Sequence, residues 1–112
     1  MKLNADDLCP GGTVVKKSEV YTVIDNTALK GLVVSKTVLH PHRSTTGHKH
    51  PGQEEVYYFI SGHGQMKVDD ELFEVRSGDV VLIPDGAFHR AFNKSRWEDL
   101  TFLCVFDGKR GH

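Results

Sequence analysis

Two histidines and a glutamate lie close together in the middle of the chain. His48 and His50 are separated by one residue, and Glu55 follows five positions after His50. On a β-strand, residues i and i+2 point to the same face, so both imidazoles would lie on one side of it. A hairpin-like return of the chain would bring the carboxylate beside them. His89, on a later strand-forming run, is a fourth candidate for the same cluster.

Imidazole and carboxylate groups together form a mixed nitrogen and oxygen set of metal ligands. Such a set suits Fe, Mn, Co, Ni or Zn, and it leaves coordination positions open on an octahedral ion. If the four side chains converge, we therefore expect one divalent transition metal per chain. Two histidines at this spacing also occur by chance as surface residues, because the chain holds 7 histidines in all.

Glu54 competes with Glu55 for the role of the acidic ligand. Glu55, Tyr57 and Phe59 alternate along a predicted strand over residues 55–60, so their side chains share one face of it. This parity favours Glu55 as the ligand. We expect Glu54 to face solvent or to lie just behind the ligands.

Strand-forming runs separated by turn residues fill most of the chain. No window long enough to count has helical periodicity, and about eight short strands at this spacing indicate an all-β sandwich or barrel. Residues 1–18 are expected to form an N-terminal arm or an extra edge strand, and residues 19–112 a single barrel domain. The runs cover residues 19–25, 31–39, 55–60, 64–69, 72–75, 80–83, 87–92 and 100–106.

Length and charge exclude several classes of function. A chain of 112 residues has room for one compact domain. With 14 basic and 15 acidic side chains, it has no net field to attract nucleic acid or anionic lipid, so we expect neither as a partner. No apolar run is long enough to span a bilayer, and the first residues lack the apolar core of a signal peptide, which favours the cytoplasm.

Two sequence motifs contain these candidate ligands. From His48 the chain reads His-x-His-x4-Glu-x6-Gly, and from Gly78 it reads Gly-x5-Pro-x-Gly-x2-His-x3-Asn. These motifs resemble the two signature motifs of the cupin superfamily. The resemblance implies a small antiparallel β-barrel or jelly roll, that is, a cupin-like double-stranded β-helix. It also implies that the metal ligands are His48, His50, Glu55 and His89. One departure is His42, which stands where the family usually has a glycine.

The segment around the first motif looks like that of the cupin-type glucose-6-phosphate isomerases of archaea. Thr45 and Tyr57 match two positions that line the sugar-phosphate pocket in those enzymes, and Gly111-His112 resembles their late Gly-His pair. This chain departs from them in a shorter stretch before Glu55 and in Phe106, which stands where they have a pocket tyrosine.

The isomerase resemblance implies a reaction in which the metal chelates a carbonyl and the adjacent hydroxyl of an open-chain sugar. Glu55 would move a proton between the two carbons, and Tyr57 would donate a hydrogen bond to a substrate oxygen. We expect Thr45, Tyr57 and Phe59 to line the substrate pocket. Packing of the barrel core is the alternative role for the two aromatic residues.

Three functions remain compatible with this chemistry. The first is a metal-dependent enzyme that acts on a small oxygenated metabolite, such as a sugar or sugar-phosphate isomerase. The second is a mononuclear metal dioxygenase, which needs the same ligands and a drier pocket. The third is a non-catalytic module that binds a metal or a sugar. In each case the expected partner is a small molecule. The apolar outer face of strand 55–60, formed by Val56, Tyr58 and Ile60, also predicts a homodimer or a second sheet packed over it.

Overall fold

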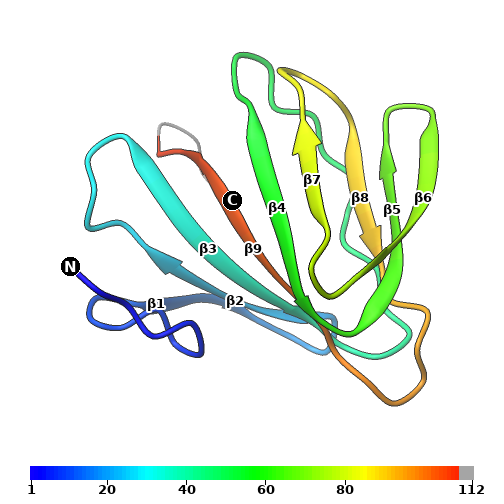
Figure 1. The fold of residues 1–112 in the computed structure, drawn as a ribbon, viewed down its shortest axis with the longest axis horizontal. Helices are drawn as coiled ribbons and strands as arrows, with labels where there is room; N and C mark the ends of the chain where they lie inside the picture. Colours follow the sequence, from blue (N-terminus) through cyan, green and yellow to red (C-terminus); the bar gives the residue numbers. More distant parts are fainter. Residues whose placement is uncertain (109–112) are drawn as a thin grey trace.

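All regular elements of the structure are β-strands. The computed structural model describes residues 1–108, and these contain nine strands in two antiparallel sheets (Figure 1). This confirms the all-β prediction. None of the described residues forms a helix that could span a membrane. The strands are β1 (Thr13–Lys17), β2 (Tyr21–Asn26), β3 (Leu32–Leu39), β4 (Glu55–Ser61), β5 (His63–Val68), β6 (Glu71–Arg76), β7 (Val80–Ile83), β8 (His89–Phe92) and β9 (Leu100–Asp107).

Strands that are far apart in the sequence are neighbours in both sheets. The six-stranded sheet has the order β1-β2-β3-β9-β4-β7, so the last strand lies between β3 and β4. The three-stranded sheet has the order β6-β5-β8. Figure 1 shows the two sheets meeting near the turn from β4 to β5 and spreading apart toward the opposite end. Such crossing connections are typical of Greek-key and jelly-roll folds.

The N-terminal arm includes an edge strand. Thr13–Lys17 pairs antiparallel with β2, with a shift of register between Val14 and Lys16. The chain before it is also fixed, because Leu8 is buried and the Asn26 side-chain amide donates hydrogen bonds to the carbonyl oxygens of Leu8 and Pro10, both at 2.8 Å. The large sheet therefore extends to residues before position 19.

Buried and exposed side chains alternate along the strands, so each strand has one inward face. Along β4, Glu55, Tyr57 and Phe59 point inward and are buried, whereas Val56 and Tyr58 between them point outward. A period of two residues is what a strand with one face on a core requires. The predicted parity of residues 55–60 is thus present in the structure.

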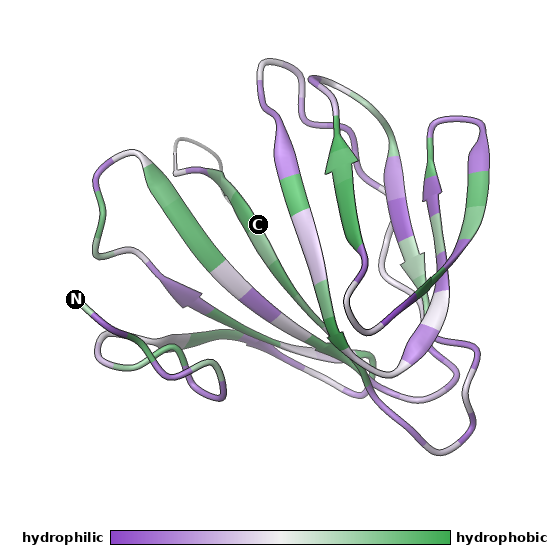
Figure 2. Ribbon diagram, in the orientation of Figure 1, coloured by the Kyte–Doolittle hydropathy of each residue, from purple (hydrophilic) through white to green (hydrophobic). Residues whose placement is uncertain are grey.

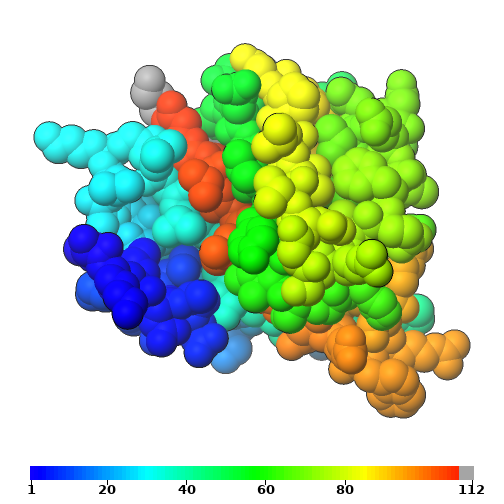
Figure 3. Space-filling model, viewed as in Figure 1, coloured from blue at the N-terminus to red at the C-terminus, as the bar shows by residue number. Residues whose placement is uncertain are grey.

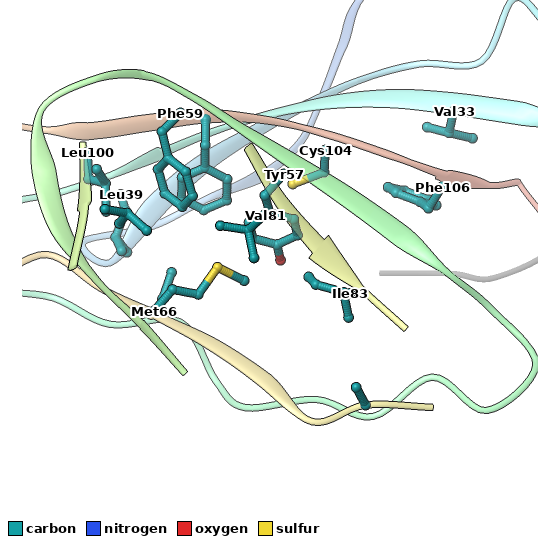
Figure 4. Packing of buried hydrophobic residues seen from close by; sticks show 14 residues of the cluster. Val33, Leu39, Tyr57, Phe59, Met66, Val81, Ile83, Leu100, Cys104 and Phe106 are labelled. Atoms are coloured by element: carbon teal, nitrogen blue, oxygen red, sulfur yellow. The ribbon is translucent and has the colours of Figure 1, made fainter. Parts of the chain in front are cut away.

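The core lies between the two sheets. Phe59, Phe102 and Leu39 from the large sheet are fully buried, as is Met66 from the small sheet. Figure 4 shows Phe59, Leu39 and Met66 in this layer, with Tyr57 and Cys104 further along it. The ring centroids of Phe59 and Phe102 are 5.1 Å apart. This apolar layer fixes the spacing of the sheets and leaves the neighbouring space free for polar side chains.

Two residues at the ends of the sequence motifs hold the connections in place. Gly62 joins β4 to β5 with a φ of +86°, and a Cβ there would collide with the Asp99 carbonyl oxygen. Asn93, which is 2% exposed, donates from its amide nitrogen to the carbonyl oxygens of Leu39 and Glu98, at 3.0 and 2.7 Å. Both motif ends thus have a structural role in the turns.

Candidate metal centre

Glu55 enters the interior of the molecule as the first residue of β4. Its backbone is paired on both sides, with Ile83 of β7 and with Phe106 of β9. The side chain is 4% exposed, so the carboxylate lies inside the fold. Glu54, one residue earlier, is exposed. The structure therefore puts Glu55, and not Glu54, on the inward face.

His89 approaches the same point from the small sheet. It is the first residue of β8, it is 4% exposed, and its Nε2 atom lies 3.3 Å from Oε2 of Glu55. Its other ring nitrogen, Nδ1, lies 3.2 Å from the carbonyl oxygen of Ala87. Because a carbonyl oxygen only accepts, Nδ1 carries the hydrogen in that contact. In the neutral ring, Nε2 then turns a lone pair toward the carboxylate.

His48 and His50 come from the connection between β3 and β4. His48 is tied to His89 by two backbone hydrogen bonds, of 3.1 and 2.9 Å, which form an isolated β-bridge. The two loop rings are stacked with centroids 5.6 Å apart, and the His50 ring lies 5.4 Å from the His89 ring. The two residues were expected on a strand, but they lie in the connection outside any regular strand. Their rings are nevertheless on the same side of the chain, as the stacking shows.

All four candidate ligands line one cavity, of about 70 Å³. Of these four residues, Glu55 and His89 are buried, His50 is half-buried and His48 is exposed. The cavity therefore has an enclosed base and a mouth where the loop histidines meet solvent.

The residues expected to contact a substrate have different positions in the structure. Thr45 and Tyr57 line the cavity. Thr45 also accepts a hydrogen bond from the backbone of Ala91 through its hydroxyl oxygen, at 3.0 Å, which fixes the loop against β8. The Tyr57 ring is stacked on Phe102, with centroids 4.9 Å apart, and is 5.8 Å from the His89 ring.

Phe59 is not among the residues that line the cavity, and its expected contact with a substrate stays a prediction. Its side chain is 0% exposed and packs in the core against Phe102 and Tyr57. The alternation along β4 predicts the face on which Phe59 lies, but it does not predict how deep the residue lies between the sheets. Phe59 is two residues further along β4 than Tyr57, away from Glu55. The Gly111-His112 pair lies outside the described residues.

The geometry of Glu55 and His89 fits a shared metal ion. Ligand atoms that are each about 2.1 Å from one ion lie about 3.0 Å apart at a right angle and about 3.4 Å apart at the tetrahedral angle. The 3.3 Å between Nε2 and Oε2 falls in this range. Within residues 1–108, no three His, Cys, Asp or Glu side chains already have an arrangement that could hold an ion. The rings of His48 and His50 would have to turn inward to complete one.

Sequence reasoning missed a polar wall of the same cavity. Lys16 of β1, and Ser35 and Thr37 of β3, also line it. The signal that could have found the last two is their alternation, which puts two hydroxyls on the otherwise apolar inward face of β3. Lys16 carried no such signal, because its position depends on β1 pairing with β2.

Comparison with protein families agrees with this fold and this site. The family described as "Cupin domain" matches residues 35–106. An oxalate-binding protein of Thermotoga maritima is 32% identical over 76 residues, which are 68% of this chain and 62% of that protein. A glucose-6-phosphate isomerase of Thermococcus kodakarensis is 31% identical over 107 residues and covers 84% of this chain and 56% of the isomerase.

Among solved structures, the oxalate decarboxylase of Bacillus subtilis, an enzyme with Mn(II) centres, superposes with a TM-score of 0.78 and 25% identity. The match covers 88% of this chain and 28% of that enzyme. The matched segment of this chain spans between 50% and 62% of the length of three curated relatives. The superposition and the family match confirm the expected jelly-roll fold.

Proposed function

The chain belongs to the cupin domain family, and we propose that its cavity binds one divalent transition metal and holds a small carboxylate, such as oxalate, on it. The proposed metal ligands are His48, His50, Glu55 and His89. When bound, the metal would supply a Lewis acid with open positions for the oxygens of the ligand. The relatives that bind or decarboxylate oxalate support this choice of ligand.

The observation that carries the proposal is the buried pair of Glu55 and His89. A lone pair on Nε2 and a carboxylate oxygen that lie 3.3 Å apart repel each other unless a proton or a metal cation lies between them. The contact of Nδ1 with the Ala87 carbonyl fixes the ring orientation, as is usual for a histidine that binds a metal. A divalent metal satisfies both requirements.

Size and charge favour a small anion as the ligand. A volume of about 70 Å³ is room for about two waters at the density of the liquid, so it suits a ligand as small as oxalate better than a hexose phosphate. Neutral imidazoles and one carboxylate around a divalent ion leave a net positive charge in the cavity. That charge stabilises an anionic ligand. The Tyr57 ring, held by Phe102, forms a rigid wall beside it.

Isomerisation of a sugar phosphate is the second candidate. It is favoured by Thr45 and Tyr57, which both line the cavity and which match pocket positions of the archaeal isomerases. In that reaction Glu55 would move a proton between two adjacent carbons. The small volume is the argument against it, because the phosphate end of the sugar would have to extend out of the mouth.

Calorimetric titration of oxalate tests the proposal. Chain stripped with a chelator and reloaded with Mn²⁺ should bind oxalate at a ratio of one per chain, and the stripped chain should not bind it. Equal binding by the stripped chain would contradict the proposal.

Activity assays on the metal-loaded chain then separate the alternatives. Anaerobic exchange between glucose 6-phosphate and fructose 6-phosphate would establish the isomerase. Oxygen consumption by iron-loaded chain with a reductant would establish an oxygenase. Release of carbon dioxide from oxalate would add catalysis to the proposed binding.

A further inference from the structure

We propose that Lys16, Ser35 and Thr37 form a second subsite of the cavity, which takes the carboxylate oxygens that point away from the metal. This inference rests on the proposed function and adds a recognition element to it. The three residues come from β1 and β3 of the large sheet, whereas the histidines come from β8 and from the loop before β4. All of them line the same cavity.

Strand register explains why these side chains meet. Lys16 is paired with Val23 of β2, and Val23 is paired with Thr37 of β3. Ser35 is two residues before Thr37, so their side chains share the inward face of β3. On its other side, Ser35 is paired with Cys104 of β9, which also lines the cavity. The subsite is thus one continuous patch across neighbouring strands.

Ser35 is the strongest sign that a ligand belongs in the patch. Its side chain is 1% exposed, and its hydroxyl has no hydrogen-bond partner among the described residues. A buried hydroxyl without a partner costs about 1 to 3 kcal/mol, and native proteins rarely leave one in that state. Because it lines the cavity, an oxygen of a bound ligand can accept from it.

Lys16 adds a positive charge that is not already neutralised. It makes no ion pair within residues 1–108, and its amine lies 6.0 Å from the centroid of the Tyr21 ring. The nearest acidic residue along the strands is Asp25, which is paired with Ser35 but does not line the cavity. The lysine side chain is half-buried, so its amine interacts with a ligand at an effective dielectric below that of water.

The arrangement suits a ligand with two groups of oxygens. One group would bind the metal beside Glu55 and His89, and the other would accept hydrogen bonds from Ser35 and Lys16. A dicarboxylate such as oxalate has both groups and fits the volume of the cavity. A neutral polyol lacks the charge that Lys16 recognises, so the subsite would select anions over sugars.

The test compares oxalate affinity in Mn²⁺-loaded chain by calorimetry. We expect Lys16→Met to weaken oxalate binding at least tenfold and Ser35→Ala to weaken it several-fold. Lys16→Arg should retain most of the affinity. Lys17→Met is the matched control, because Lys17 is the adjacent residue of the same strand and is exposed. It should change the affinity less than twofold.

Two further readouts separate recognition from a structural defect. Mn²⁺ affinity, measured by the electron paramagnetic resonance signal of free Mn²⁺, should be the same in Lys16→Met and in the unchanged chain. The loss of oxalate affinity with added NaCl should be steeper in the unchanged chain than in Lys16→Met. If the unchanged chain binds oxalate and Lys16→Met binds it equally well, the subsite is wrong while the proposed function stands. If the unchanged chain binds no oxalate, both are wrong.

Discussion

At the scale of single residues, the chemistry of the site depends on which atoms are buried. Glu54 and Glu55 have identical side chains, yet only Glu55 lies inside the fold, 3.3 Å from His89. Burial of a carboxylate is costly unless a partner compensates for it. The compensation proposed here is a metal ion shared with the histidines.

Replacing the two glutamates in turn tests this assignment. Glu55→Ala should reduce the metal content of the purified chain at least tenfold, because it removes the buried oxygen ligand. Glu54→Ala should leave the content unchanged, since its side chain is exposed. Elemental analysis by mass spectrometry measures both. A loss in Glu54→Ala with none in Glu55→Ala would reverse the assignment.

At the scale of the elements, glycines at turns permit strands to approach each other. Gly62 and Gly52 both have a φ of +86°, but their surroundings differ. A Cβ on Gly62 would collide with the backbone of Asp99, whereas nothing lies within 4 Å of one on Gly52. Gly62 therefore permits both a turn and the close approach of the Asp99 backbone, whereas Gly52 permits only a turn.

The two glycines therefore form a matched pair for a stability measurement. Gly52→Ala should lower the free energy of unfolding by about 1 to 2 kcal/mol, the cost of a left-handed conformation for alanine. Gly62→Ala should cost about 3 kcal/mol or more, because the backbone must also shift. Urea unfolding followed by circular dichroism compares them. Equal losses of unfolding free energy in the two variants would mean that the backbone at Gly62 shifts without cost to admit a Cβ.

At the scale of the whole molecule, the proposed metal would connect the two sheets. Glu55 belongs to β4 of the large sheet and His89 to β8 of the small one. A ligand that binds only the folded chain stabilises it by mass action.

Metal should therefore raise the melting temperature. At a free Mn²⁺ concentration of 100 times its Kd, the gain is about 2.7 kcal/mol, or roughly 10 °C for a chain of this size. A chelator should reverse the shift, and Glu55→Ala should show none. Differential scanning calorimetry measures all three. An unchanged melting temperature in the presence of excess metal would contradict a site made by the folded chain.

The outer face of the large sheet carries exposed apolar side chains on β4 and β7. Leu82 and Val80 on β7 are 70% and 57% exposed, and each is paired with an outward residue of β4, Val56 or Tyr58. In Figure 2, β7 is hydrophobic along most of its length, and Figure 3 shows β9, β4 and β7 side by side on one face. The expected homodimer would bury this apolar face.

Sedimentation velocity tests the dimer. Leu82→Lys should shift the chain to monomer, because it places a charge on the apolar face that the dimer would bury. Leu72→Lys is the control, since Leu72 is 57% exposed on β6 of the small sheet. If both variants sediment like the unchanged chain, this face is not the interface.

The sequence by itself determined the local features of this protein. Residues 55–60 are rich in aromatic and β-branched side chains, so their strand follows from local physics, and its period of two puts Glu55, Tyr57 and Phe59 on one face. The motif spacing likewise identified the four candidate ligands and the glycine and asparagine that end the motifs. These features depend only on residue types at fixed separations along the chain, and the sequence contains both.

Only the tertiary structure decided which residues share the cavity. Lys16 is more than 30 positions from His48, and it reaches the cavity because β1 pairs with β2 and β2 with β3. Phe59 shares the inward face of β4 with Tyr57, but its side chain is 0% exposed and is not among those that line the cavity. Strand pairing and depth arise from contacts between distant segments, and no local pattern encodes them.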